Sequence, residues 1–274
     1  MRRRLVLFVA LAWAPIGACS FVSTDGLAGG SSDASALDAS PAPDANDASE
    51  ARDSSVDVTP DGPDAARDPR LIAEYAFEDP DGVVALDTSG NGKHGNLIGA
   101  SFTAAGKRGR ALEVHGADFL DVPGLTGGNL FPSSGTFSVW CRYTFPPNDV
   151  GDRGVLDAHD GSRAHLFLRH AGSGTPGTLQ AAFQLGDGSG QYTFVSTFPA
   201  PQNTWIHVVM TWDDQASIGA VYVGGVLVVQ LPYSTKPYVP DGQIFHLGQG
   251  FIGAIDEVKV FNRSLPASEA TALE

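Results

Sequence analysis

The chain has 274 residues, a formal net charge of −14 and two cysteines, Cys19 and Cys141. An acidic chain without a basic stripe is a poor partner for nucleic acid or other polyanions, and two cysteines cannot build a disulfide framework. The composition changes twice along the chain, so we consider three segments separately: residues 1–19, 20–69 and 70–274.

Residues 1–19 have the pattern of an export signal that ends in a lipid attachment site. Three arginines precede an apolar run from Leu5 to Ile16, which is too short to span a bilayer comfortably. The run leads into Gly17-Ala18-Cys19, which resembles the lipobox of bacterial lipoproteins. This resemblance implies acylation of Cys19 and a protein held at the outer membrane or cell surface of a bacterium through its lipid alone. An ordinary signal peptide with a coincidental cysteine is the alternative.

Residues 20–69 form a segment rich in Asp, Ala, Ser and Pro, with eleven acidic and two basic residues. So little apolar surface cannot offset the conformational entropy of folding, and we expect a disordered linker. Its like charges and prolines favour extended conformations. The simplest interpretation is a tether that lifts a domain away from a membrane.

From residue 70 onward, apolar and polar residues alternate as they do in half-buried strands. The alternation is clear over Phe137–Phe145 and Thr204–Trp212, and residues 221–230 read as a hairpin with Gly224-Gly225 at its turn. Only Ser264–Leu273 has a helical pattern. The pattern predicts an all-β, antiparallel two-sheet sandwich of about a dozen strands. Further strands are expected at 71–77, 111–114, 119–122, 153–157, 164–169, 178–185, 191–197, 243–247 and 251–261.

Six segments follow one another in order across residues 71–274: Tyr75–Glu78, Asp87–Gly95, Gly106–Val114, Thr136–Arg142, Thr204–Thr211 with Tyr222–Leu227 as a central hairpin, and Gly253–Asn262 as a closing strand. Together they resemble LamG-like jelly-roll domains of the concanavalin A-like lectin/glucanase superfamily. The resemblance implies a jelly roll whose relatives include both lectins and glucanases.

Because that superfamily includes glucanases, catalysis needs a test. A retaining glycosidase needs two carboxylates about 5 Å apart, and acids at alternate positions of one strand would supply them. Asp256 and Glu257 are adjacent, so regular alternation sends them to opposite faces. No nucleophile elbow, phosphate loop or metal-binding histidine pair occurs in the sequence. We therefore expect no enzymatic activity.

Two side chains of the strand around residue 140 are candidates for sugar binding. Trp140 and Arg142 share the polar face of that strand, and an aromatic ring beside a polar group suits a sugar. Coverage by another part of the fold is the competing interpretation. Cys141 falls on the apolar face, which favours burial over a reactive thiol. His207 reads as a structural histidine.

A calcium site is a further expectation at the closing strand, 251–261. Regular alternation places Asp256 with the apolar residues of that strand, where a carboxylate needs a partner. Glu78, Asp87 and Asn91 follow the first strand and could meet Asp256 there if the terminal strands are neighbours. Calcium suits such an oxygen-rich set in an exported protein. Alternatively, Asp87 and Asn91 shape turns and Asp256 fastens a loop by hydrogen bonds.

Together these patterns predict a noncatalytic binding module displayed at the cell surface, with carbohydrate as the ligand class. A structural or protein-interaction domain of the cell envelope is the alternative, so the expected partner is a glycan or an envelope or extracellular protein. A glycoside hydrolase or its accessory domain comes third. Fold resemblance alone is a weak guide to function, and the ligand itself is not specified by these patterns.

Acylation of Cys19 is directly testable. Mass spectrometry of the mature N-terminus should find a lipid-modified Cys19, because the apolar run delivers this residue to the cleavage point. Cys19→Ser should move the protein from the detergent phase to the aqueous phase, since removal of the acyl chains removes the anchor. An unmodified cysteine, or unchanged partitioning of the variant, would show that the protein is not anchored in this way.

Overall fold

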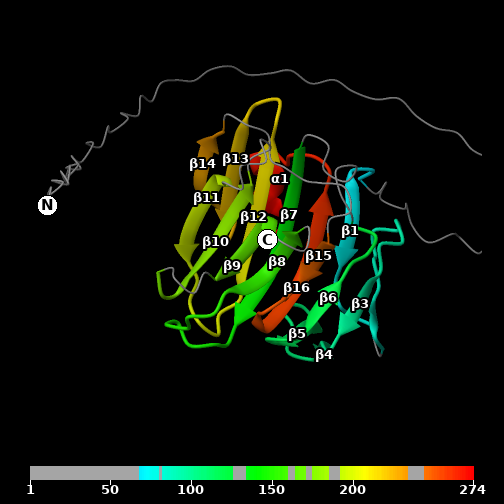
Figure 1. The fold of residues 1–274 in the computed structure, drawn as a ribbon. Helices are drawn as coiled ribbons and strands as arrows, with labels where there is room; N and C mark the ends of the chain where they lie inside the picture. The colour runs from blue at the N-terminus through cyan, green and yellow to red at the C-terminus, as the bar shows by residue number, and fades with distance from the viewer. Residues whose placement is uncertain are drawn as a thin grey trace, which may run out of the picture. The chain divides into compact units, whose positions relative to one another are not determined.

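The computed structural model (Figure 1) describes the C-terminal domain expected from residue 70 onward, together with Asp68 and Pro69 just before it. The expected signal segment and the linker up to residue 67 lie outside the described residues. No helix in the described part of the chain is long and apolar enough to span a bilayer. The described residues are 68–79, 82–125, 134–159, 164–170, 175–184, 192–233 and 244–274.

Two antiparallel sheets form the domain, as the sequence predicted. Sheet A has the order β14 (Val226–Pro232), β13 (Ile218–Val223), β12 (Ile206–Asp213), β7 (Ser134–Tyr143), β16 (Ile252–Phe261), β5 (Ala111–His115) and β4 (Ser101–Thr103), and β1 (Leu71–Tyr75) also pairs with β16. Sheet B has the order β11 (Tyr192–Pro199), β10 (Thr178–Gln184), β9 (Ala164–His170), β8 (Arg153–His159), β15 (Ile244–Leu247), β6 (Phe119–Asp121), β3 (Gly95–Ile98) and β2 (Val84–Ala85). The described strands exceed the expected dozen because β2, β3 and β4 are too short to show alternation.

The inner face of sheet A follows the alternation read from the sequence. Phe137, Val139 and Cys141 of β7 lie in the core, opposite Val208 and its alternate neighbours on β12. Burial raises the pKa of the Cys141 thiol to about 12. The structure confirms that Cys141 lies in the core, and a raised pKa disfavours the reactive thiolate. At the predicted hairpin, Gly224 and Gly225 both have positive φ, as a two-residue turn of the primed type requires.

Strand β16 departs from regular alternation, and this corrects the expectation for Asp256. The pairing of β16 with β7 shifts between Asp256 and Lys259, and Glu257 has a φ of 49°. A bulge of this kind inserts a residue and reverses the faces that follow it. Ile255 on one side of the bulge and Val258 on the other therefore both enter the core. Asp256 points to the outer face, opposite the valines with which alternation had grouped it.

The C-terminal helix α1 (Ala267–Ala272) packs on the outer face of sheet A. Leu265 and Ala270 contact Val209, Tyr222 and Phe261, which project outward from β12, β13 and β16. This small second core explains why outward-facing apolar residues of these strands are buried. The short helix was expected from the sequence, and its packing covers part of that sheet.

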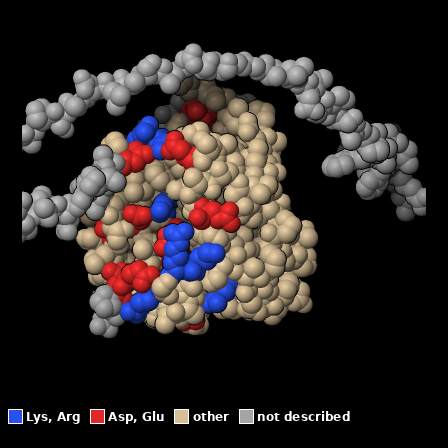
Figure 2. All heavy atoms as spheres, turned by 180° about the vertical axis from the view of Figure 1, so that it is seen from behind, with Lys and Arg blue, Asp and Glu red and all other residues tan. Residues whose placement is uncertain are grey.

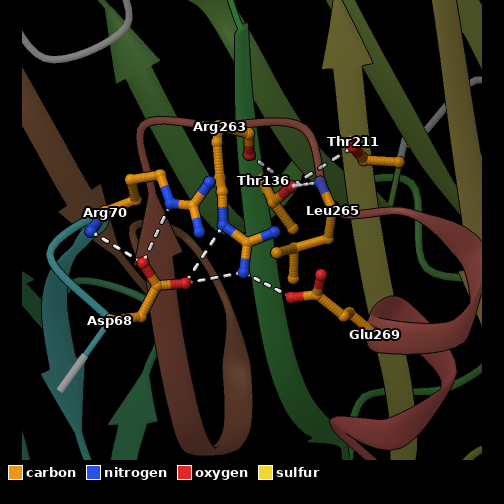
Figure 3. A network of polar contacts seen from close by, with 7 residues as sticks. All are labelled: Asp68, Arg70, Thr136, Thr211, Arg263, Leu265 and Glu269. Carbon is orange, nitrogen blue, oxygen red and sulfur yellow. Dashed lines mark hydrogen bonds and ion pairs between the residues drawn. The ribbon is translucent and has the colours of Figure 1, made fainter. Parts of the chain in front are cut away.

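Arg263, just after β16, joins both ends of the described chain (Figure 3). Its guanidinium donates to Asp68 at 2.6 Å and also to Glu269 of α1. Burial raises the pKa of Asp68, but hydrogen bonds from Arg70 and Arg263 outweigh it and hold the pKa at about 2. Asp68, which belongs to the expected linker, thus contacts the folded domain directly.

We predict that Arg263→Ala lowers the free energy of unfolding by about 1 kcal/mol, because the Asp68 carboxylate loses its charged donor near the solvent-screened surface. A chain that begins at residue 60 should melt like the full protein, whereas one that begins at residue 70 loses Asp68 and should melt lower. Urea unfolding and thermal melting measure both effects. Equal melting of the two truncated chains would show that Asp68 does not stabilise the fold.

Candidate functional site

The outer face of sheet B carries a row of side chains that are far apart in the sequence. Its neighbouring strands pair so that core residues Leu97, Leu120, Leu247, Leu156 and Leu168 form one inward row. Because side chains alternate along a strand, the residues one position away face outward together. This outer row consists of Asn96, Asp121, His246, Asp157 and Phe167, from β3, β6, β15, β8 and β9.

His246 lies at the centre of the outer row and contacts several side chains around it. Its Nε2 is 3.6 Å from a carboxylate oxygen of Asp121, and its Nδ1 is 3.0 Å from the amide oxygen of Gln249. The ring of Phe119 lies against the imidazole, with 4.3 Å between ring centroids. Asp121, Asp157 and Phe119 are half-buried and Asn96 is exposed. The face therefore offers hydrogen-bond acceptors beside an aromatic ring.

One side of the row is bordered by Phe167 and Arg169 of β9. The Arg169 guanidinium lies over the Phe167 ring at 4.2 Å, and it is 3.5 Å from Asp152. Phe167 itself is only 1% exposed, so the accessible part of the row ends at Asp157. With strands about 4.8 Å apart, the row from Asn96 to Asp157 spans about 14 Å. A surface of that length with amide, carboxylate and aromatic groups can contact several sugar units.

The two acids of the row are poorly placed for glycoside hydrolysis. Asp121 and Asp157 lie on strands separated by β15, so their backbones are about 10 Å apart. A retaining enzyme needs about 5 Å between the carboxyl groups, and an inverting one needs room for a water between them. Here the imidazole of His246 stands in that space. The arrangement favours binding over hydrolysis.

Trp140 and Arg142, the candidates from the sequence, lie on the outer face of sheet A, as their alternation predicted. Trp140 is only 5% exposed, because the Lys107 ammonium lies 3.8 Å from its ring centroid and His207 stacks beside it. Arg142 lies over the half-buried Trp205 at 5.0 Å. The structure brings the two candidates together but leaves no open ring face on Trp140.

His207 is buried beside Trp140, and one of its ring nitrogens is hydrogen-bonded. Its Nε2 is 2.8 Å from the Ser138 hydroxyl, while Nδ1 has no hydrogen-bond partner in the described part of the chain. Burial, together with Lys259, Arg108 and Lys107, lowers the pKa of His207 to about 4. A neutral histidine fixed by a serine fits the structural role expected from the sequence.

Asp256 fastens the loop of residues 105–110 over Trp140. One carboxylate oxygen accepts N–H bonds from Lys107 at 2.8 Å and Arg108 at 3.0 Å, and the other accepts from Glu257 at 2.8 Å. Glu78 binds the same loop, through the backbone N–H of Arg110. Since Glu257 also pairs with the Arg108 side chain, Asp256 and Glu257 approach one loop rather than opposite faces.

Asp87 and Asn91 lie apart from that loop and shape the turn after β2. Asp87 accepts N–H bonds from Glu74, Ser89 and Lys93, and Asn91 donates to the carbonyl of Leu71. No group of three or more His, Cys, Asp or Glu side chains within the described residues could hold a metal ion. Both carboxylate oxygens of Asp256 accept hydrogen bonds from backbone N–H groups, which take the place that a bound cation would have. Calcium binding stays a prediction, to be tested by melting in calcium and in EDTA.

Sequence reasoning missed the outer row of sheet B. Its members come from five strands between residues 96 and 246, and no spacing along the chain reveals such a cross-strand register. The sequence showed only the period-two alternation of each strand. This alternation tells which residues share a face of the strand, but not which residues of other strands lie beside them.

The two-sheet sandwich with an open polar face has the architecture of lectin-type jelly rolls. Residues 116–271 match the sequence profile of the concanavalin A-like lectin/glucanases superfamily, and the chain belongs to this superfamily. This confirms the resemblance found in the sequence. No curated protein matches the chain.

Solved structures with the same fold include one domain of an extracellular enzyme and two binding domains. Domain 4 of AbnA, a GH43 extracellular arabinanase from Geobacillus stearothermophilus, in complex with arabinotriose, is 21% identical, with a TM-score of 0.56 over 74% of this chain and 98% of that one. The ligand binding domain of botulinum neurotoxin serotype D, in complex with N-acetylneuraminic acid, is 12% identical, with a TM-score of 0.57 over 74% and 50%. The binding domain of Paraclostridial Mosquitocidal Protein 1 is 14% identical, with a TM-score of 0.55 over 74% and 51%. The chain spans about half of the last two domains, and identities this low show the fold alone.

The environment of Asp256 predicts a pH-dependent stability. Burial outweighs the hydrogen bonds and raises the pKa of Asp256 to about 6. A raised pKa stabilises the fold below the pKa of the unfolded chain, and this contribution disappears as the pH rises through about 6. Relative to Asp256→Asn, the wild type should lose about 2 kcal/mol of unfolding free energy between pH 4 and pH 7.5. Urea unfolding at both pH values measures it, and a difference independent of pH would contradict the raised pKa.

Proposed function

We propose that this chain is a noncatalytic, surface-displayed carbohydrate-binding module, with its glycan on the outer face of sheet B. The observation that carries the proposal is the cross-strand row of Asn96, Asp121, His246 and Asp157. Carboxylate and amide oxygens accept hydrogen bonds from sugar hydroxyls, and the Phe119 ring offers an apolar contact to the C–H groups of a sugar.

The ligand class follows from the chemistry of this face. Two carboxylates at its centre suit a neutral, hydroxyl-rich glycan and repel an anionic one. Complexes of similarly folded domains with arabinotriose and with N-acetylneuraminic acid support a glycan as the ligand. The expected lipid at Cys19 and the acidic linker would display the domain outside the cell.

A protein-interaction role is the second candidate, and one observation favours it. The edge strand β14 exposes apolar side chains, with Val226 66% and Leu227 46% exposed. Its outer edge pairs with no described strand, and such an edge can accept a strand from a partner. Capture of an envelope protein that is lost on Leu227→Lys, without glycan binding, would favour this role.

Asp121→Ala should weaken glycan binding about tenfold, because a hydrogen bond to a charged acceptor is lost. A glycan array identifies the ligand, and calorimetry with the full chain measures the affinity. Glu113→Gln, on sheet A and 41% exposed, is the matched control and should bind like the wild type. Absence of binding to any glycan would refute the proposal.

Hydrolysis is measured separately, on the same glycan and on a panel of polysaccharides. No reducing ends should appear, because His246 separates the two acids of the row. Release that disappears in Asp121→Asn or Asp157→Asn would make the protein a hydrolase instead.

A further inference from the structure

Lysine and arginine side chains gather on the outer side of sheet A, although the chain as a whole is acidic. Figure 2 shows this cluster near the middle of the face, with acidic side chains around it. Lys107, Arg108 and Lys259 lie close enough to His207 to lower its pKa. Arg142 projects from the same face of β7, next to the loop of residues 105–110.

Two of these cations have no carboxylate partner among the described residues. Arg108 pairs with Glu257 at 3.4 Å, and Lys259 pairs with Glu74 at 3.3 Å. No carboxylate of the described residues lies within ion-pair distance of Lys107 or Arg142. These two cations lie over indole rings instead, on Trp140 and Trp205 respectively.

Hydrogen-bond donors are also in surplus here. Trp140 Nε1, Arg142 Nε and His207 Nδ1 are all buried without a hydrogen-bond partner within the described chain. The nitrogens of Trp140 and Arg142 can only donate. A patch with two unpaired cations and unused N–H groups lacks an acceptor, and an oxyanion supplies one.

The strand register places these groups in two adjacent rows. Trp140 lies directly opposite His207, and Arg142 is two residues further along β7, beside Trp205. Lys107 is exposed, and Arg142 and Trp205 are half-buried, so this end of the face is open to solvent. The acids of the neighbouring strand β16 are otherwise engaged, Asp256 by backbone N–H groups and Glu257 by Arg108. Glu113 lies one strand further away, on β5 and opposite Ala254.

We propose that Lys107, Arg142 and Trp205 form a second binding site, which takes the carboxylate of an acidic sugar. The planar guanidinium of Arg142 matches a carboxylate in shape, the Lys107 ammonium adds a second charge, and the indole of Trp205 borders the sugar ring. The net charge of −14 repels polyanions, so the site suits a glycan with a single acidic unit. This second site goes beyond the proposed function, because it lies on sheet A rather than sheet B and would bind an anionic sugar, which the acids of sheet B repel.

The test compares a disaccharide that ends in glucuronic acid with the same disaccharide ending in glucose. With the full chain, tryptophan fluorescence should change on titration with the acidic sugar, since Trp140 and Trp205 lie at the site. The acidic sugar should bind at least tenfold more tightly than the neutral one, and added salt should weaken it. Arg142→Gln and Lys107→Gln should each reduce that affinity about tenfold. Arg110→Gln, in the same loop but over Phe102, is the matched control and should have no effect.

Several outcomes would overturn the site. Equal affinity for the two disaccharides would rule out the proposed site, and so would an unchanged affinity for the acidic sugar in Lys107→Gln. Because Lys107 is exposed, this variant should still fold. Asp121→Ala should leave binding of the acidic sugar intact. If Asp121→Ala abolishes that binding while Arg142→Gln preserves it, the acidic sugar lies on sheet B and only the proposed function stands.

Discussion

The buried carboxylate of Asp256 is the interaction on which much of this domain depends. It sits at a bulge in β16, where Glu257 adopts positive φ and the following residues change faces. The bulge sends Ile255 and Val258 into the same core, and Asp256 outward to three backbone N–H groups. Because two of those N–H groups belong to Lys107 and Arg108, one side chain joins the closing strand to a loop almost 150 residues earlier.

The two faces of the sandwich are consequently used in different ways. On sheet A, helix α1 covers Val209, Tyr222 and Phe261, and Lys107 of the loop of residues 105–110 covers Trp140. Arg263 joins α1 to the start of the domain. On sheet B, a row of acids around His246 reaches the outer surface. Coverage stabilises the first face and leaves a cluster of cationic groups near its middle (Figure 2). The second face presents acceptors and an aromatic ring, which is the combination that sugar hydroxyls and C–H groups require.

Local patterning predicted the fold well where one face of a strand is apolar throughout. Phe137–Phe145 and Thr204–Trp212 alternate without interruption, and both strands lie in the structure as expected, with Cys141 in the core. The hairpin at Gly224-Gly225 needed only its turn residues. Regular alternation predicted the wrong face for Asp256. A bulge inserts one extra residue into β16 at this point, and the hydrophobic pattern of the sequence gives no sign of it.

The sequence by itself determined the jelly-roll family, the direction in which each regular strand points its apolar face, and the burial of Cys141. These follow from a side-chain period of two and from the cost of exposing apolar surface, which act locally. Only the tertiary structure decided that Trp140 is covered, and that Asn96, Asp121, His246 and Asp157 stand side by side. Those facts depend on strand order and register, which are set by packing between residues far apart in the chain.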